Sequence, residues 1–350
     1  MFVGLDLSRK RVDVVGLGGG GDVCWLDAVA PDRDGLAALV DRCPAGPAEV
    51  VAAVESMTGA RFVHDELERQ GWDVRIADAR RAKGIAPLAC KTDRVDARVL
   101  AELCRRELVP EVWLPDPLVR EERELARFRL QLVKQRTQLK NRIHATLASH
   151  GLACPVSDLF GRNGRALLAA MPLLEPWRGD VEASLRLVDQ LDREVHALER
   201  ELRRRGADHR YVPLLLTCPG IGWVLAFTIA AEIGDIDRFA NAGKLVAYSR
   251  LAPRVHQSGE HDRRGPLTKN GPRYLSWAFV EAAQHAHRHP ACSTLYNSTK
   301  ARWGKQRGSQ VATVAVARKL VIAVWHMLTR EQPFAPPSAT QGLAPSSAQV

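Results

Sequence analysis

Short runs of apolar residues, broken by turn residues, fill the first part of the chain and predict β-strands. Five runs have this character, at residues 1–8, 12–17, 23–26, 48–55 and 73–77. The first three are joined by tight turns and a glycine tract, so we expect them to be antiparallel. The run that ends at Glu55 is continuously apolar, which is typical of a fully buried strand.

Apolar residues at three-to-four spacing predict helices between and after these strands. In the first part of the chain they fall at residues 31–43 and 60–70, and a third helix starts at Asp93 with Thr92 as its cap. Strands that alternate with helices place this region in the α/β class.

The pattern after residue 117 is almost entirely helical. Long helices are expected at 118–150 and 181–205, an apolar helix at 224–233, and another helix from Tyr274. In the second long helix, apolar residues 188, 191, 195, 198 and 202 follow a seven-residue repeat. That seam can pair with the first long helix or with a second subunit, and the pattern leaves both open.

Four carboxylates stand at unusual places in this pattern. Asp6 lies inside an apolar strand, Glu55 ends a buried strand, and Asp93 and Asp96 share one face of a helix's first turn. An acid in a strand needs something to offset its charge, whereas Asp13 sits at a polar position and we expect it to be solvated. Carboxylates suit one or two Mg²⁺ ions, although Asp at a helix start is also common on plain solvated surfaces.

This arrangement resembles the RuvC-like set of RNase H-like nucleases, with their Asp-Glu-Asp-Asp quartet. The resemblance covers about the first 110 residues, and residues 4–8 and 91–97 are its most specific parts. It implies that Asp6, Glu55, Asp93 and Asp96 hold Mg²⁺ beside a scissile phosphate.

Charge is divided unevenly along the 350 residues. Through residue 115 there are 16 Lys and Arg against 19 Asp and Glu, and in the remainder 34 against 21, so the net charges are −3 and +13. An acidic region followed by a basic one fits a metal-dependent catalytic part and separate parts that hold a nucleic acid. In the first long helix, Arg136 and Lys140 are candidate contacts to its backbone.

The seven scattered cysteines include no Cys-x-x-Cys pair, which argues against a zinc site and for a reducing compartment. No run of about 18 apolar residues lacks a charge, and the chain starts directly in a strand without a basic leader. We therefore expect no membrane span and no signal peptide, and a cytoplasmic, nucleoid-associated protein.

Two glycine-containing segments in the basic part carry candidate chemistry. Pro219-Gly220-Ile221-Gly222 lies between expected helices, as in a helix-hairpin-helix motif, where backbone N–H groups at Gly220 and Gly222 can approach a phosphate. Residues 250–271 read as a polar, basic loop in which Ser258 is a candidate nucleophile and Arg263, Arg264 and Lys269 could hold its phosphate target.

Three other hydroxyls are rivals to Ser258 as the nucleophile. Tyr248 sits in an apolar pattern and is expected in the core, and Tyr274 and Ser276 open a helix, where they are less free to move. An ordinary turn serine remains the alternative to a catalytic one.

The order of these parts resembles the insertion-sequence 110 family of transposases, the bridge-RNA-guided recombinases. The resemblance spans about residues 1–330 and includes Leu251-Ala252-Pro253, Ser258-Gly259 and Lys269-Asn270-Gly271. Many relatives continue with Asn and then Leu-Arg, whereas this chain has Pro272 and Leu275-Ser276. It implies that Ser258 attacks a DNA phosphate, that a structured RNA pairs with donor and target DNA, and that dimers assemble into tetramers.

We therefore expect four regions. These are a RuvC-like metal domain at 1–115, a helical coiled-coil linker at 116–210, a serine-containing transposase domain at 211–332 and a disordered tail at 333–350. Two other functions stay open: a Mg²⁺-dependent, structure-specific nuclease that uses water, and a non-catalytic DNA- or RNA-binding protein.

Overall fold

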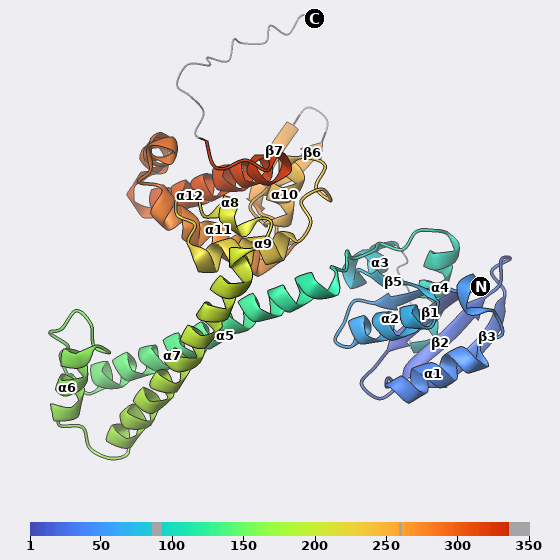
Figure 1. Cartoon of the computed structure of the whole chain (residues 1–350), viewed down its shortest axis with the longest axis horizontal. Helices are drawn as coiled ribbons and strands as arrows, with labels where there is room; N and C mark the ends of the chain where they lie inside the picture. The colour runs from blue at the N-terminus through green and yellow to red at the C-terminus, as the bar shows by residue number, and fades with distance from the viewer. Residues whose placement is uncertain (86–92, 259–260, 336–350) are drawn as a thin grey trace, which may run out of the picture. The chain divides into compact units, whose positions relative to one another are not determined.

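A computed structural model describes residues 1–85, 93–258 and 261–335 (Figure 1). The chain forms two compact units, Met1–Pro115 and Asp116–Val350. The division falls at the Pro-rich turn where the sequence predicts a boundary. The further subdivision near residue 210 stays a prediction.

The first unit is built on a five-stranded mixed sheet of order β3-β2-β1-β4-β5. Its strands are β1 (Phe2–Leu7), β2 (Val12–Leu17), β3 (Val23–Val29), β4 (Val51–Glu55) and β5 (Asp73–Ala77). The first three are antiparallel, as predicted, and β4 and β5 run parallel to β1. The parallel strands need crossovers, which the helices between them supply.

Helices cover both faces of this sheet. They are α1 (Arg33–Arg42), α2 (Ala60–Arg69), α3 (Ala79–Ile85) and α4 (Asp93–Arg105), with a 3₁₀ turn η1 at Pro47–Glu49. Leu36 and Leu39 of α1 and Val63 of α2 pack on one face, with Val3 and Leu5 of β1. Ala97 and Ala101 of α4 pack on the other. We did not predict α3, because it is only seven residues long.

One glycine lets α4 lie directly on the sheet. A Cβ atom at Gly4 would stand 1.7 Å from the carbonyl oxygen of Ala97 and 2.6 Å from the amide nitrogen of Ala101. No side chain fits there, so the α4 backbone touches β1. Because strand side chains alternate between faces, Phe2, Gly4 and Asp6 share the α4 side of the sheet.

The second unit begins with two long helices that pack on each other, α5 (Pro117–Ser149) and α7 (Trp177–Ala207). Val188, Val195 and Leu202 of the predicted seven-residue repeat are buried within this single chain. Helix α6 (Arg162–Ala170) lies at the far end of the pair, away from the remaining helices (Figure 1).

The remaining helices form one apolar core centred on α9. They are α8 (Val212–Leu215), α9 (Trp223–Ile233), α10 (Ala242–Tyr248), α11 (Arg273–Ala286) and α12 (Pro290–Arg330). All nine residues from Leu225 to Ile233 are buried, which matches the apolar character of that segment. Helix α12 contains a non-helical residue at Gly304, which divides it into two helical parts.

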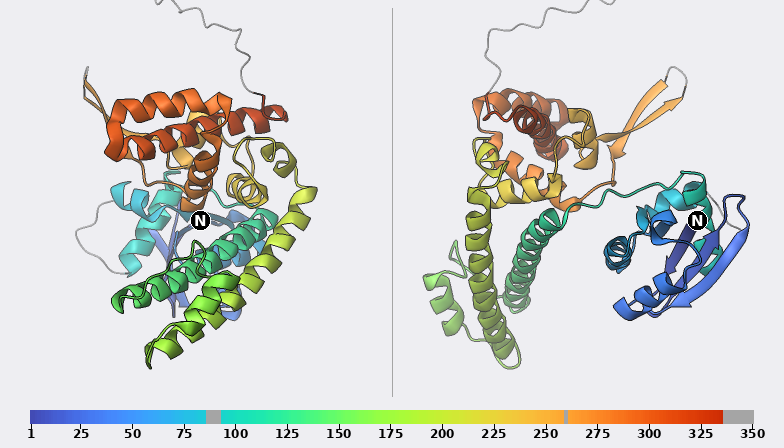
Figure 2. Two further views of the ribbon diagram at one scale, coloured as in Figure 1. Left: turned by 90° about the vertical axis from the view of Figure 1, so that its left-hand side faces the viewer. Right: turned by 45° about the vertical axis from the view of Figure 1, so that its right-hand side comes forward.

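A β-hairpin replaces the loop that we expected at residues 250–271. Its strands are β6 (Pro253–Ser258) and β7 (His261–Leu267), which project from the helical core in Figure 2. The loop prediction was wrong because it rested on composition: glycine and charged residues dominate this segment. A two-stranded ribbon can form from such residues, since it needs no apolar face.

Helix α12 includes an 18-residue window that is long and apolar enough to cross a membrane by composition alone. Half of that window is buried inside the protein, and Val316, Leu320 and Val324 belong to the helical core. The packing is therefore that of a core helix.

Candidate catalytic site and nucleic-acid contacts

Asp6 and Glu55 lie side by side where the neighbouring parallel strands β1 and β4 end, and we call this border of the sheet its carboxyl edge. Leu5 of β1 pairs with Val54 of the parallel strand β4, so Asp6 and Glu55 are the next residue of each strand. Ala53 packs with Leu100 and Cys104 of α4, so Glu55, two residues on, also faces α4. This edge is the carboxyl end of the parallel strands, where ligands bind in open α/β sheets.

Asp93 and Asp96 reach the same edge from the first turn of α4. Asp96 directly precedes Ala97, the residue whose carbonyl lies against Gly4. Gly4 and Asp6 are two positions apart on one face of β1, so this contact brings the start of α4 toward Asp6. The predicted cap, Thr92, lies outside the described residues.

The Asp6 carboxyl group is affected by all three of these acids. Its pKa is raised from an ordinary value of 3.8 to about 6, first by burial and then by the negative charges of Asp93, Asp96 and Glu55. Each of these effects disfavours the charged form. A divalent cation offsets such a cluster, so the donor set suits Mg²⁺ chemically.

The four carboxylates do not close into a ready coordination shell. Among the residues that the structure describes, no three His, Cys, Asp or Glu side chains converge closely enough to hold a metal ion. Their charges are close enough to raise the pKa of Asp6, but metal binding would have to draw the four carboxylates closer together.

Asp13 was wrongly expected to be solvated. It pairs with Asp6 across β1 and β2, is only 6% exposed, and accepts a hydrogen bond of 2.6 Å from the Arg11 guanidinium. Its charge is a further contribution to the raised pKa of Asp6. The alternation along β2 that buries Val15 and Leu17 against α4 turns Asp13 toward the same side, a signal that the sequence did contain.

A cation that we did not predict also lies at the carboxyl ends of these strands. Lys83 of α3 places its Nζ 3.6 Å from Oε1 of Glu55. The lysine side chain is largely exposed, so it can leave Glu55 when a stronger cation binds.

Ser258 is the last residue of β6, beside the hairpin turn, and its backbone pairs with that of His261. Arg263 and Arg264 lie on β7, opposite His256 and Val255. Lys269 follows the hairpin and is exposed. Ser258 and the four acids belong to different units.

The rival nucleophiles are held by their surroundings. Tyr248 packs against the helical core, with its ring centroid 5.2 Å from that of Phe239, as expected. Tyr274 and Ser276 lie in the first turn of α11. The Tyr274 hydroxyl accepts a hydrogen bond of 3.3 Å from the Arg273 guanidinium.

The glycine hairpin lies between two helices, α8 and α9, but its two glycines differ. Gly220 has φ +80°, and a Cβ atom there would lie 2.2 Å from the carbonyl oxygen of Ala282 in α11. Close packing against α11 therefore explains why residue 220 is a glycine, without any contact to a phosphate. Gly222 is the N-cap of α9, and no heavy atom lies within 4 Å of where its Cβ would stand.

The two basic candidates on α5 both contact other side chains of the second unit. Arg136 forms an ion pair with Asp192 of α7. Lys140 lies with its Nζ 4.7 Å from the ring centroid of Phe160. Their charges are therefore less available to a nucleic acid than the sequence suggests.

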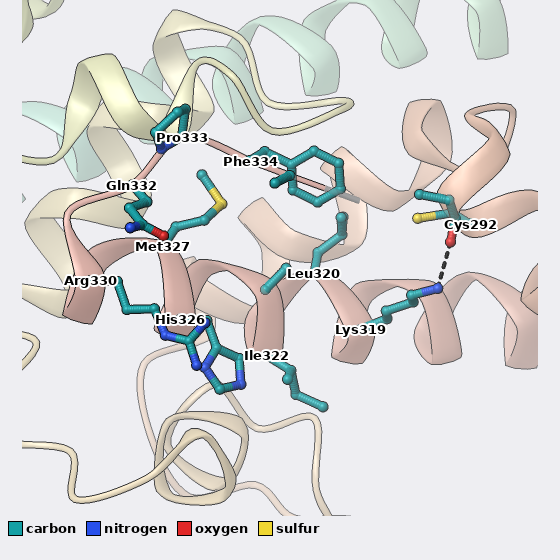
Figure 3. A pocket seen from close by; sticks show the side chains of 13 residues that line it. Cys292, Lys319, Leu320, Ile322, His326, Met327, Arg330, Gln332, Pro333 and Phe334 are labelled. Atoms are coloured by element: carbon teal, nitrogen blue, oxygen red, sulfur yellow. Dashed lines mark hydrogen bonds between the residues drawn. The ribbon is translucent and has the colours of Figure 1, made fainter. Parts of the chain in front are cut away.

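The second unit also contains a cavity of about 370 Å³ beside α12 (Figure 3). Leu320, Met327 and Phe334 form its apolar walls, and the Lys319 ammonium donates a hydrogen bond to the Ala291 carbonyl. Its lining includes no carboxylate, so the cavity is unsuited to a Mg²⁺ site. Residues 333–335 line it, although we predicted disorder from Pro333 onward. The rest of that predicted tail, residues 336–350, lies outside the described residues.

Two known protein families match this chain. Residues 3–151 match a transposase family of the DEDD type found in IS110 elements. Residues 212–298 match a family described as "Transposase IS116/IS110/IS902 family". The first match includes all four acids, and the second includes the hairpin with Ser258.

Several curated proteins are similar over most of their length. A probable family 20 transposase of Pseudomonas aeruginosa is 28% identical over 82% of this chain and 86% of its own. The transposase for insertion sequence element IS1111A of Coxiella burnetii is 27% identical over 70% and 68%. An uncharacterized 44.8 kDa protein of insertion element IS116 from Streptomyces clavuligerus is 25% identical over 97% and 98%.

Proposed function

Because this chain belongs to the IS110 family of transposases, we propose that Asp6, Glu55, Asp93 and Asp96 hold Mg²⁺ and that Ser258 is the nucleophile that attacks DNA. The family makes the protein an enzyme that moves an insertion sequence by cutting and rejoining DNA. The DEDD-type match also implies an RNase H-like fold for the first unit and a dependence on divalent metal. The identity and number of the ions belong to our proposal.

The observation that carries the metal site is that acids of β1, β4 and the first turn of α4 gather near the carboxyl ends of the parallel strands, where they raise the pKa of Asp6 to about 6. Burial contributes most to it, and the negative charges of Asp93, Asp96, Glu55 and Asp13 contribute the rest. Acids that destabilise one another in this way become favourable when a cation binds among them. When bound, Mg²⁺ would supply charge neutralisation and Lewis-acid activation at the scissile phosphate.

The chain's own residues have separate tasks in the proposed reaction. The Ser258 hydroxyl oxygen attacks phosphorus and loses its proton, a bond from phosphorus to a sugar oxygen breaks, and the freed sugar oxygen takes up a proton. The product is a phosphodiester between serine and one DNA strand. A sugar hydroxyl of another strand can reverse these steps, so rejoining needs no ATP. Arg263, Arg264 and Lys269 would hold the phosphate through charge-assisted hydrogen bonds.

Covalent trapping tests the serine assignment. We expect DNA to remain attached to the protein after denaturation, and Ser258→Ala to abolish this adduct while DNA binding persists. Ser276→Ala is the control for a serine at a rigid helix start. Adducts that survive in Ser258→Ala would refute the assignment.

A nuclease that activates water is the second candidate. Its support is that all four acids lie within the first unit, so the metal site needs no residue of the second. It predicts DNA cleavage that depends on Asp6 and is indifferent to Ser258→Ala. If the wild-type protein bound DNA without cleaving it, and Asp6→Asn bound it equally well, only a binding role would remain.

The proposed partners are donor and target DNA, a structured bridge RNA and further copies of the chain, in the cytoplasm at the nucleoid. The predicted apolar seam on α7 packs on α5 of the same chain, so a dimer would need other contacts. Sequencing the RNA that copurifies with the protein tests the guide, and light scattering tests the dimer and tetramer.

A further inference from the structure

Three cations surround the ring of Tyr274, at the start of α11. The guanidinium carbons of Arg127 and Arg273 lie 5.0 and 5.2 Å from the ring centroid, and the Lys134 ammonium lies 5.6 Å from it. Arg127 and Lys134 come from α5 and Arg273 from α11, so two elements far apart in sequence converge there. An aromatic ring attracts each cation, but the three cations repel one another.

Only one of the three charges is offset by a carboxylate. Arg127 donates hydrogen bonds of 2.7 and 2.8 Å to the two carboxylate oxygens of Glu232, which is fully buried. Within the described ranges, neither Lys134 nor Arg273 lies at ion-pairing distance from an acid, and both are exposed. Two positive charges at one ring thus lack a counter-charge.

This cluster stands where the chain leaves the serine hairpin. Arg273 follows the end of β7 by six residues. The Thr268 amide donates a 2.9 Å hydrogen bond to the Ala252 carbonyl, which ties the two ends of the hairpin together next to α11. The positive end of the α11 dipole adds to the two side-chain charges.

We propose that Lys134, Arg273 and Tyr274 form a phosphate-binding site that positions a DNA strand beside the serine hairpin. A backbone phosphate supplies the missing counter-charge, and the Tyr274 hydroxyl, which accepts from Arg273, orients the guanidinium toward it. The site names a DNA contact for the proposed recombination reaction and rests on that function. DNA is favoured over RNA because the cluster adjoins the hairpin that carries the proposed nucleophile.

The salt dependence of DNA binding tests this site without any chemistry. The full-length protein is titrated with a fluorescent 40-base-pair duplex in EDTA at several salt concentrations. A plot of log K against log salt has a negative slope, and each lost phosphate contact should make that slope less steep by about 0.9. The double substitution Lys134→Ala with Arg273→Ala should therefore reduce its magnitude by about 1.8. Lys134→Arg should keep the wild-type slope, because the charge stays.

As a control, two substitutions on α12 remove the same amount of positive charge away from Tyr274. Arg302 and Lys305 are exposed on α12, and Arg302→Ala with Lys305→Ala should change the slope by much less. An unchanged slope in the Lys134 and Arg273 variant overturns the proposal, and so does an equal loss in the α12 variant. A loss confined to a structured RNA probe of equal length also overturns it.

The role of Tyr274 separates positioning from catalysis. Tyr274→Phe should weaken DNA binding several-fold, because the hydroxyl that orients Arg273 is lost. At DNA concentrations that saturate the variant, it should still form the covalent adduct. Loss of the adduct with unchanged affinity would make Tyr274 a nucleophile and refute the positioning role. Because binding is measured without Mg²⁺, Asp6→Asn and Ser258→Ala should leave the salt slope unchanged even if the proposed chemistry is wrong.

Discussion

Asp6 connects sequence, fold and chemistry at the scale of a single residue. Its pKa is about 6 because it is half-buried near four other acids, so at neutral pH the folded protein carries an unfavourable charge there. The folded state therefore binds this proton more tightly than the unfolded state. Metal-free stability at this group rises as pH falls from about 6 toward 4.

Asp6→Asn should stabilise the metal-free protein at pH 7.5. After allowance for solvent screening the gain is about 1 kcal/mol, and it should shrink as pH falls through 6 because the wild-type carboxyl becomes protonated. Thermal unfolding in EDTA at several pH values measures it, with Asp41→Asn as an exposed control. With Mg²⁺ present the order should reverse. A variant less stable than wild type in EDTA would contradict the cluster.

At the scale of elements, two contacts position the functional parts. Gly4 lets α4 lie on β1 and so brings Asp93 and Asp96 to the sheet edge. In the second unit, Glu232 joins α9 to α5 through Arg127, and the Arg123 guanidinium donates hydrogen bonds to the carbonyls of Ala231 and Glu232. Each contact predicts the effect of a single substitution.

Gly4→Ala should destabilise the first unit by about 3 kcal/mol or more, because the new methyl group meets backbone atoms that cannot turn aside. The displacement of α4 should also reduce the stabilisation by Mg²⁺. Gly19→Ala is the control, since its Cβ would meet no atom within 4 Å. Equal unfolding midpoints for the two variants would show that α4 does not depend on this contact.

Glu232→Gln should cost about 3 kcal/mol, because it leaves Arg127 without a counter-charge in a partly buried position. Urea denaturation measures the loss. Glu201→Gln removes an acid that is paired with Arg204 and Arg205 on the surface of α7, and its midpoint should stay near wild type. If the two variants unfolded alike, burial would not be what makes the Glu232 pair important.

The sequence predicts the elements of the first unit well, because its strands and helices carry strong periodic patterns. The hairpin β6–β7 escapes prediction, since a ribbon with little apolar surface has the composition of a loop. At the candidate site, the positions of Asp6 within the first strand and of Glu55 at the end of a buried strand are readable from the pattern. The closeness of α4 is not, because it depends on a tertiary contact at Gly4 that one sequence cannot reveal. The pairing of Arg136 with Asp192 is hidden for the same reason.

At the scale of the whole molecule, the proposed metal ligands and the proposed nucleophile lie in different units. The proposed reaction would therefore require the two units to meet, within one chain or between two copies. Substitutions in each unit can distinguish the two.

Asp6→Asn and Ser258→Ala, each inactive alone, should restore covalent DNA adducts when the two chains are coexpressed. In a mixed dimer with shared sites, about half of the sites would combine intact acids from one copy with an intact serine from the other. Mixing Asp6→Asn with Glu55→Gln is the control, since no such combination arises. Failure to complement, with mixed dimers shown to form, would place each site within one chain.

The start of the C-terminal tail has a practical consequence. The Phe334 amide donates a 2.8 Å hydrogen bond to the Thr217 hydroxyl, and the Phe334 ring covers apolar residues of the core. A fusion partner or affinity label should therefore be attached after Ala335. Truncation before Gln332 would expose an apolar surface beside α12 and favour aggregation in storage.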